Sequence, residues 1–400
     1  MNLKQQKLLI VEEALKDHRG HWYEYDKAVT DINRAIGVNV TLAAHQTVSQ
    51  DIIEELNALP LFKYTNWDDI YNSPIAIKRY WGILKHNWRV YNTLDKFIAA
   101  SEPFDCVFVP TVIIYHLVAW RFLVRKYQGK KFKRVVLFIR NNAGSYHDNS
   151  TQPVFKRSTV LLKKVLQGFS SSSVCFATDS DRLAREYNIL SGLDFSVFPS
   201  PRIKLPAQKK EKKQGEPVIM SCLGPARLEK GIDVLQEAIL HLLRQKPDLN
   251  VKFIIQWNME IFLLDGTQLK PDPALSQKVV FLTSALSSEE YDDYMSQTDC
   301  MVLPYHRQSY YARISGVGVE AATAGIPIIF TKDTWMEDAV SQYGAGIGIE
   351  DKNALDLAEK IELMVSKIDE YKEKAMARAL IAQAYHSPDN FLKCLWENVE

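Results

Sequence analysis

The chain has 400 residues, of which 46% are hydrophobic and 24% are charged. This length predicts two domains of roughly 200 residues each, and the composition is that of a globular protein, which excludes a disordered or fibrous one. The formal net charge is +1, so no strong field attracts polyanions and we expect no nucleic-acid partner.

The N-terminus and the cysteines predict a cytoplasmic protein. The apolar centre of MNLKQQKLLIVEEALKD is short and soon meets Glu12 and Glu13, which favours a first strand over a secretion signal. The five cysteines are odd in number and no pair has metal-ligand spacing, so we expect reduced thiols. No stretch reaches the roughly 18 uncharged apolar residues of a membrane span.

The first half alternates apolar strand-like runs with helix-like stretches. Residues 8–11 are predicted to form a strand, 22–36 a helix and 38–43 a second strand. Residues 76–100 carry aromatic and aliphatic residues at steps of three and four, which predicts an amphipathic helix whose aromatic face is core. Further short buried strands are predicted at 106–110, 135–139 and 174–177. This alternation indicates a parallel sheet with helices on both faces.

The pattern breaks at PSPRIKLPAQKKEKKQGEP, where prolines and lysines predict a solvated linker. After it strands and helices alternate again, with strands expected at 218–223, 251–256, 279–282 and 300–303. We therefore predict an N-terminal doubly wound domain over 1–200 and a C-terminal one over 201–380. A final helix over 381–400 is expected to pack back on the N-terminal domain. Ligands of such sheets bind beyond the carboxyl ends of the strands, so two facing domains would form a cleft between them.

The stretch CLGPARLEKGID is the first candidate for chemistry. Gly224 allows a turn after a strand, and Arg227 and Lys230 stand in the loop before a helix. Gly231 keeps the backbone bare at the helix start. Two cations beside a helix N-terminus make an anion site. Ordinary solvated charges in a strand–helix loop would leave the same pattern, and both interpretations stay open here.

The stretch SYYARISGVGVEAATAGIPIIF is the second candidate. Ser315, Gly316, Val317 and Gly318 are expected to place backbone N–H groups at the start of a helix, where phosphate oxygens bind. Glu320, in the first turn, can accept hydrogen bonds from neutral hydroxyls such as those of a ribose. The alternative is a capped helix whose glycines serve packing against the sheet.

Together these motifs resemble those of the retaining glycosyltransferases of family four, which have the GT-B architecture of two facing Rossmann-like domains. The glycine, basic residue and Lys-Gly pattern of that family is matched by Gly224, Arg227, Lys230 and Gly231. Its glycine loop and glutamate motif is matched by Gly316, Gly318, Glu320, Ala321, Gly325 and Pro327. The resemblance implies a nucleotide-sugar donor held by Gly20, Gly224, Ser315, Gly316, Val317, Gly318 and Glu320. It covers residues 174–350 well and the first 170 residues in outline.

The sequence departs from the family at two positions. The arginine that often follows the first glycine is replaced by Pro225, and Arg227 lies two residues further on. The first of two glutamates eight positions apart would fall at Ala312, where there is no carboxylate, and Arg313 stands beside it. The identity of the donor sugar therefore stays open.

The function implied is retaining transfer of a sugar from a nucleotide-diphosphate sugar to a glycan or glycolipid, in polysaccharide or glycoconjugate biosynthesis. Arg227, Lys230 and Glu320 are the catalytic candidates, and the two cations would stabilise the leaving diphosphate in place of a metal. We expect no metal and no cofactor beyond the nucleotide sugar. Two alternatives remain: a nucleotide-sugar epimerase, and a catalytically degenerate subunit that binds a nucleotide sugar or a partner enzyme.

The N-terminal domain is expected to hold the acceptor, with His21, Arg140 and Asn141 as the leading candidates. Residues 120–134, WRFLVRKYQGKKFKR, combine cations with three aromatic residues and could rest on an anionic membrane at its inner face. A basic, solvated helix end would have the same composition.

Overall fold

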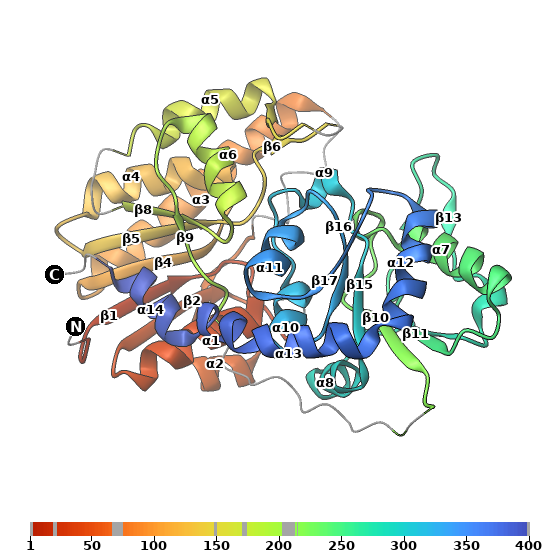
Figure 1. Cartoon of the computed structure of the whole chain (residues 1–400). Coiled ribbons are helices and arrows are strands. Elements are labelled where there is room, and N and C mark those ends of the chain that lie inside the picture. Colours follow the sequence, from red (N-terminus) through yellow and green to blue (C-terminus); the bar gives the residue numbers. More distant parts are fainter. Residues whose placement is uncertain are drawn as a thin grey trace. The chain divides into compact units, whose positions relative to one another are not determined.

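The computed structural model describes residues 3–18, 22–65, 75–147, 150–169, 174–201, 213 and 215–397. The chain divides into two compact units (Figure 1). Unit 1 consists of Met1–Ser145, Pro153–Ile203 and His386–Glu400. Unit 2 consists of Tyr146–Gln152 and Lys204–Tyr385.

A seven-stranded parallel sheet forms the centre of unit 1, in the order β3-β2-β1-β4-β5-β8-β9 (Figure 1). Its strands are β1 (Lys7–Val11), β2 (Asn39–His45), β3 (Ala58–Phe62), β4 (Phe104–Val112), β5 (Phe132–Ile139), β8 (Val174–Thr178) and β9 (Ser196–Val197). Counted along the chain, this is the order 3-2-1-4-5-6 of a Rossmann sheet, extended by one strand. The order reverses between β1 and β4, which is where a sheet of this kind binds its ligands.

Helices cover both faces of this sheet. They are α1 (Trp22–Ala35), α2 (Gln50–Leu56), α3 (Ala76–Ala100), η1 (Ile114–His116), α4 (Leu117–Tyr127), α5 (Arg157–Leu166), α6 (Asp181–Ser191) and α14 (Pro388–Trp396). A two-stranded ribbon, β6 (Gly144–Ser145) with β7 (Val154–Phe155), lies apart from the sheet. Helices α1, α2 and α14 pack on one face, and α3, α4 and α5 on the other (Figure 1).

The last helix is part of the core of unit 1. Phe391 of α14 packs edge-on against Phe108 and Phe198, with ring centroids 5.9 and 5.8 Å away. The indole N–H of Trp396 donates a hydrogen bond of 2.8 Å to the side chain of Asn33 in α1. Both aromatic residues of α14 are buried, so the last helix completes the face of the sheet that α1 and α2 leave open.

A six-stranded parallel sheet forms unit 2, in the order β14-β11-β10-β15-β16-β17. Its strands are β10 (Val218–Cys222), β11 (Val251–Gln256), β14 (Val279–Leu282), β15 (Cys300–Leu303), β16 (Ile328–Thr331) and β17 (Gly346–Ile349). Counted along the chain this is again the order 3-2-1-4-5-6, and the reversal lies between β10 and β15.

The helices of unit 2 form two groups. They are η2 (Leu228–Lys230), α7 (Ile232–Gln245), η3 (Pro273–Leu275), α8 (Ser288–Gln297), α9 (Arg307–Tyr310), α10 (Gly316–Thr323), α11 (Trp335–Tyr343), α12 (Ala354–Ser366) and α13 (Ile368–Tyr385). A hairpin of β12 (Ile261–Phe262) and β13 (Gln268–Leu269) adds to them. One hydrophobic cluster joins the sheet to α7 and α12, and a second joins it to α8, α10, α11 and α13. The prediction of an α/β fold with two doubly wound parallel sheets is confirmed.

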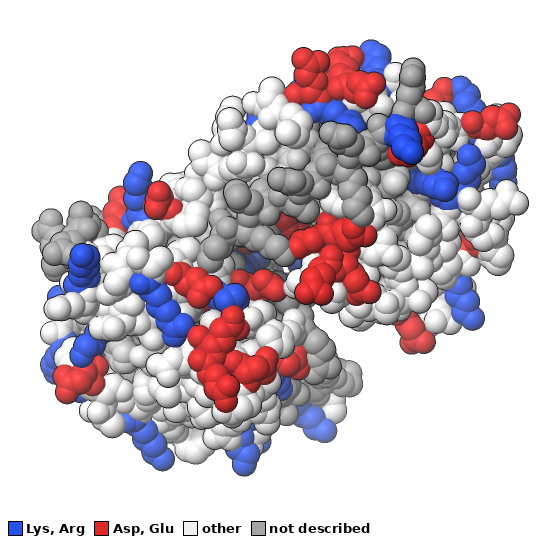
Figure 2. Space-filling model, turned by 90° about the horizontal axis from the view of Figure 1, so that it is seen from below, with Lys and Arg blue, Asp and Glu red and all other residues white. Residues whose placement is uncertain are grey.

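Two surface properties of the described residues bear on partners. On the face shown in Figure 2, acidic side chains gather in groups, whereas basic side chains are scattered and form no continuous area. Within the described part of the chain, every helix is too short or too polar to cross a bilayer.

The helix predicted at 76–100 is α3, but the prediction that its aromatic face is core is wrong. Trp81 and Trp88 lie in solvent, as do Ile77 and Leu84, and the helix packs on the sheet through other residues such as Leu94. Periodicity indicates that a helix is amphipathic, but it does not say whether the apolar side meets the core or the surroundings.

Candidate active site

The first loop of the candidate site follows β10, at the point where the strand order of unit 2 reverses. Gly224 has φ +87°, a backbone conformation that residues other than glycine rarely adopt. Its N–H donates a hydrogen bond of 2.7 Å to the side-chain oxygen of Gln256, which fixes the turn. Gly231 (φ +67°) ends η2, and a Cβ there would lie 2.0 Å from the carbonyl oxygen of Pro304. The glycine of this Lys-Gly pair is therefore required by close packing.

Lys230 turns inward from this loop. Only 5% of the residue is exposed, and its Nζ lies 5.7 Å from the centre of the Tyr305 ring. No described residue forms an ion pair with this ammonium group. Burial, and next the charge of Arg227, lower the pKa of Lys230 to about 8. An unpaired buried cation is costly unless a ligand compensates it, so the arrangement favours an anionic ligand.

The two predicted motifs meet at Lys230. A Cβ built on Gly224 would lie 2.8 Å from Lys230 Nζ and 3.4 Å from Cγ2 of Val317. Gly224 and Val317 come from loops that are far apart in the sequence, so the fold brings the first motif against the first turn of α10. These three predicted residues therefore lie at one place.

The second loop begins α10 with a capped turn. The side chain of Ser315 accepts a hydrogen bond of 3.1 Å from the N–H of Gly318. A Cβ on Gly318 would lie 3.3 Å from Cβ of Ser315, so this glycine serves packing, whereas a Cβ on Gly316 would meet no atom within 4 Å. The packing interpretation thus applies to Gly318. Gly316 has open space where a Cβ would lie, in the first turn of α10, and the first-turn N–H groups of a helix can bind anions. The phosphate-binding role of this loop stays a prediction.

Glu320 is half-buried in α10 and accepts a hydrogen bond from the hydroxyl of Tyr291 in α8. The side chain of Glu320 is thus held in place by a neighbouring helix. A fixed orientation suits a carboxylate that accepts hydrogen bonds from a ligand. The sequence analysis did not identify Tyr291, because its hydrogen bond to Glu320 forms only in the folded protein.

Two arginines lie near Lys230. Arg227 is exposed and forms an ion pair with Glu229, with Nη1 and Oε1 3.3 Å apart. The guanidinium of Arg313 lies 5.0 Å from the centre of the Tyr310 ring, and its charge also contributes to the lowered pKa of Lys230, after burial and Arg227. Arg313 was given no role in the sequence analysis, although it stands beside the second motif. The three cations together form a basic site.

Ala312, the position where the family's first carboxylate would fall, is fully buried. The carboxylate of the family pattern is thus absent, and this position is not exposed to solvent.

Arg140 of unit 1 lies in a buried group of charges. Its Nε is 3.9 Å from Oδ2 of Asp179, and its guanidinium lies 3.8 Å from the centre of the Tyr25 ring. Burial raises the pKa of Glu12 to about 7, against hydrogen bonds that lower it, and burial also raises the pKa of Asp26, followed by the charge of Glu12. The charge of Arg140 acts on both acids. Arg140 therefore has acidic neighbours within the unit in addition to any acceptor.

The other predicted acceptor residues are less defined. The backbone carbonyl of Asn141 accepts a hydrogen bond of 2.8 Å from the hydroxyl of Tyr187, which fixes its loop. Gly20, predicted to contact the donor, and His21, predicted to contact the acceptor, lie outside the described residues. The roles of these residues stay predictions.

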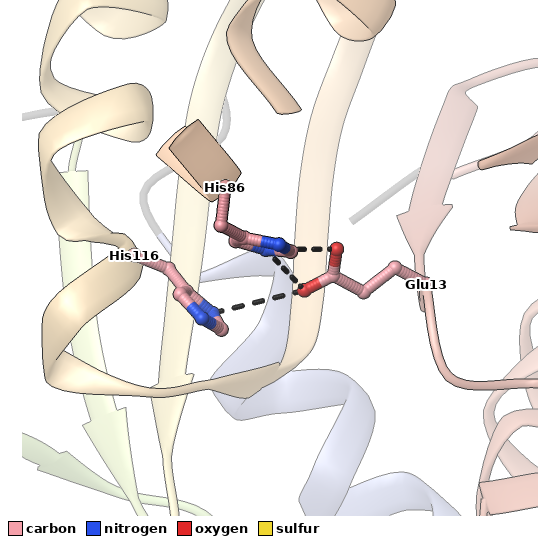
Figure 3. Close-up of side chains that lie close together, drawn as sticks. All are labelled: Glu13, His86 and His116. Carbon is pink, nitrogen blue, oxygen red and sulfur yellow. Dashed lines mark hydrogen bonds and ion pairs between the residues drawn. The ribbon is translucent and has the colours of Figure 1, made fainter. Parts of the chain in front are cut away.

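One set of described side chains in unit 1 has the chemistry of a metal site: Glu13, His86 and His116 (Figure 3). The set lies where the strand order of unit 1 reverses, between β1 and β4. In the sequence, its residues are distant from both donor motifs.

Residues 204–385 match the protein family Glycosyl transferases group 1. No curated protein matches the sequence. Among solved structures, the fold resembles sucrose-phosphate synthase from Thermosynechococcus elongatus, with a TM-score of 0.64 and 13% identity over 99% of this chain and 96% of that one. It also resembles HepE of Anabaena in complex with UDP and glucose, with a TM-score of 0.62 and 13% identity over 99% of both chains. A glycosyltransferase from Rickettsia africae ESF-5 has a TM-score of 0.64 and 14% identity over 98% of this chain and 99% of that one.

These findings define the class of the protein. Unit 2 is a glycosyl transferases group 1 domain, and the whole chain has a GT-B-like fold. The match confirms the resemblance to family four for the domain over residues 204–385.

Proposed function

We propose that the protein transfers a sugar, with retention of configuration, from a nucleoside-diphosphate sugar to a glycan or glycolipid in polysaccharide or glycoconjugate biosynthesis. The observation that carries this proposal is the convergence of Lys230 on Gly224 and Val317, which brings a buried, unpaired ammonium group to the first turn of α10. HepE, which shares the fold, was solved with UDP-glucose, so uridine donors are the first to test.

In the proposed reaction, the bond between the anomeric carbon and the diphosphate oxygen breaks, and its electron pair stays on the diphosphate. The acceptor hydroxyl oxygen bonds to the anomeric carbon from the same face, and its proton passes to the departing oxygen. Negative charge grows on the diphosphate as the sugar becomes oxocarbenium-like. Lys230, Arg227 and Arg313 would stabilise that charge together with the N-terminus of α10, without a metal.

Glu320 would bind the ribose hydroxyls of the donor. Its carboxylate is oriented by the Tyr291 hydroxyl and lies on the same short helix as Gly316 and Val317. A ligand whose phosphates lie at the helix N-terminus would therefore meet the carboxylate one turn further along. Arg140 and Asn141 stay the proposed acceptor contacts in unit 1.

Ala312 favours one alternative, a subunit that binds a nucleotide sugar but does not turn it over. Alanine has no carboxylate, so no acidic group can reach the donor sugar from this position. The epimerase alternative has fold support only, from a putative UDP-N-acetylglucosamine 2-epimerase of Listeria monocytogenes with a TM-score of 0.56 and 14% identity. Each alternative is an outcome of the next experiment.

We expect the purified protein to release UDP from at least one UDP-sugar, slowly with water and faster with an oligosaccharide or glycolipid acceptor. Release is followed chromatographically with EDTA present, because the cations do the work of a metal. Binding of UDP without release would indicate the degenerate subunit, and a changed sugar still attached to UDP would indicate the epimerase. Loss of UDP affinity in EDTA, measured by calorimetry, would contradict a metal-independent donor site.

The exposed apolar face of α3 in unit 1 indicates where the protein could encounter a lipid-linked acceptor. Ile77, Trp81, Leu84 and Trp88 of α3 are 75, 68, 58 and 66% exposed, and Tyr80 lies beside them. They recur at i, i+4, i+7 and i+11, which places them on one face of the helix. These five residues are the aromatic stripe. Contiguous exposed apolar surface of this kind marks a site that contacts a membrane or a protein.

The charges around the aromatic stripe favour an anionic membrane surface. Lys78 and Lys85 are exposed on the same helix, and α3 has no acidic residue before Asp95. The neighbouring α4 adds exposed Phe122, whereas Trp120 and Tyr127 of the predicted segment 120–134 are buried. The membrane contact that we propose therefore centres on α3 rather than on residues 120–134. Aromatic residues with flanking cations are the composition of helices that lie in the interface of a bilayer.

The double variant Trp81→Ser, Trp88→Ser tests this contact. We expect the wild type to float with vesicles of phosphatidylglycerol and phosphatidylcholine, and the variant to lose about tenfold or more of that binding. Leu264→Ser, which removes another exposed apolar side chain, is the matched control and should float as the wild type does. Equal flotation of wild type and double variant would contradict the contact. A dimer in solution that the double variant loses would show that a second copy covers the stripe instead.

A further inference from the structure

Three segments of unit 1 meet at one buried point. Glu13 follows β1, His86 lies in α3, and His116 ends η1 after β4. Figure 3 shows the three side chains pointing toward one another. Glu13 and His86 are 73 residues apart in sequence, so only the fold brings them together.

The distances match those between ligands of one metal ion. His86 Nε2 lies 3.2 Å from Glu13 Oε1, and His116 Nδ1 lies 3.7 Å from the same oxygen. One ligand atom of each residue lies within 4.8 Å of the other two. In a tetrahedral zinc site with bonds of about 2.0–2.1 Å, neighbouring ligand atoms are about 3.3 Å apart.

The cluster is sealed from solvent. Glu13, His86 and His116 are 8, 2 and 4% exposed, and Nε2 of His116 is buried without a hydrogen-bond partner among the described residues. The cluster therefore combines buried imidazole and carboxylate groups, which are side chains that bind Zn²⁺ in proteins.

A hydrogen-bonded Glu–His pair explains only part of this arrangement. It gives Glu13 Oε1 and His86 a partner, but it leaves Glu13 Oε2 without a hydrogen bond among the described residues. It also gives no reason to bury a second imidazole, whose ring centroid lies 4.5 Å from that of His86. A divalent cation would offset the charge of the buried Glu13 carboxylate and give both imidazoles a partner.

A small cavity adjoins the cluster. Its volume is about 20 Å³, enough for one water molecule, and Glu13, His116 and Thr111 line it together with apolar side chains. A water molecule there could serve as the fourth ligand, in the open position that sites with three protein ligands leave.

We propose that Glu13, His86 and His116 form a binding site for a divalent transition metal, and that the metal bound there is Zn²⁺. Two nitrogen ligands and one carboxylate suit Zn²⁺, and the same set suits Fe²⁺. The metal ties the end of β1 to α3 and to the end of β4. Because none of these three residues belongs to the donor motifs of unit 2, the metal stabilises unit 1 and leaves nucleotide binding unchanged.

Metal content and thermal stability test the site without any assay of turnover. The full-length protein, freed of any affinity tag, is stripped with a chelator, incubated with Zn²⁺, desalted and analysed by elemental mass spectrometry. We expect about one zinc per chain, a Tm several degrees above that of the stripped protein, and a visible absorption band when Co²⁺ replaces Zn²⁺. Parallel incubation with Fe²⁺ without oxygen shows which metal binds.

His86→Gln and His116→Gln should each lower the bound zinc below about one tenth of an equivalent. His241→Gln is the matched control, because His241 lies on α7 and its side chain hydrogen-bonds only to Gln245 among the residues described here. Circular dichroism shows whether each variant folds. If a variant does not fold, the Co²⁺ spectrum of the wild type decides whether histidine and carboxylate ligands hold the metal. Less than a tenth of an equivalent in the wild type, or full zinc retention in both variants, would overturn the proposal. Neither result bears on UDP release, so the proposed function is judged separately.

Discussion

Replacing Lys230 by methionine is expected to lower turnover by about two to three orders of magnitude and, at the same time, to raise the melting temperature. The loss follows because removing one group that stabilises developing charge typically costs about 3–4 kcal/mol in the transition state. The gain follows because the ammonium is buried and unpaired in the folded protein. Lowering its pKa from 10.5 to about 8 corresponds to at most about 3–4 kcal/mol, which the folded protein regains when the charge is removed.

The sign of this effect can be checked with pH. Because the folded pKa is lower than the unfolded one, the unfolded chain binds more protons between about pH 8 and pH 10.5, and stability rises with pH in that window. Affinity for UDP moves the opposite way, since the free protein loses its cation above about pH 8. In Lys230→Met both dependences should disappear, whereas Lys252→Met, at an exposed position of β11, should behave as the wild type. A Lys230→Met protein with wild-type turnover at saturating donor would remove Lys230 from the leaving-group site.

Glu320→Gln is expected to weaken donor binding by about ten- to a hundredfold with little change in stability. A hydrogen bond to a charged group is worth roughly 1.5–3 kcal/mol, and each 1.4 kcal/mol is about tenfold in affinity. Calorimetry with UDP and thermal melting are measured on one preparation. If Glu320 serves only its own helix, the melting temperature falls and the affinity does not.

Tyr291→Phe provides the matched control for this prediction. It removes the hydroxyl that orients the Glu320 carboxylate but leaves the carboxylate in place. We expect a smaller loss of affinity, below about tenfold, and no further loss when Tyr291→Phe is added to Glu320→Gln. Additive losses would show that the two residues act separately.

The fold could be predicted because each of its signals is local. The apolar run after Lys7 and the one before Leu223 are short and bounded by polar turns, and helical spacing lies between them. Alternation of this kind leads to a doubly wound sheet through general rules of connection, so the fold class followed without knowledge of any distant contact.

The candidate site was predictable only in part. Glycines next to cations marked both loops, but nothing in the sequence showed that Lys230 is buried while Arg227 stays exposed. That difference depends on Pro304 and Tyr305, which approach from another strand. The sequence analysis therefore treated two unlike cations as equals.

The contacts that were missed all join distant segments. The expectation of no metal rested on the lack of a ligand spacing motif, and Glu13, His86 and His116 have none because each comes from a different element. The solvent exposure of Trp81 could not be predicted from the sequence either, because an aromatic residue on a helix can pack in a core or contact a membrane surface equally well. Sequence spacing reports neighbours within one helix, not neighbours across the sheet.

The position of α14 in the core of unit 1 determines the order in which the chain can finish folding during synthesis. The ribosome adds about 5–20 residues per second and releases the N-terminal part first. Unit 1 still lacks Phe391 and Trp396 when the last residue of unit 2, Tyr385, has been made. The unit that begins the sequence is therefore the last to be completed, and a ribosome that stops before Pro388 leaves the nascent chain with an uncovered patch on its first sheet.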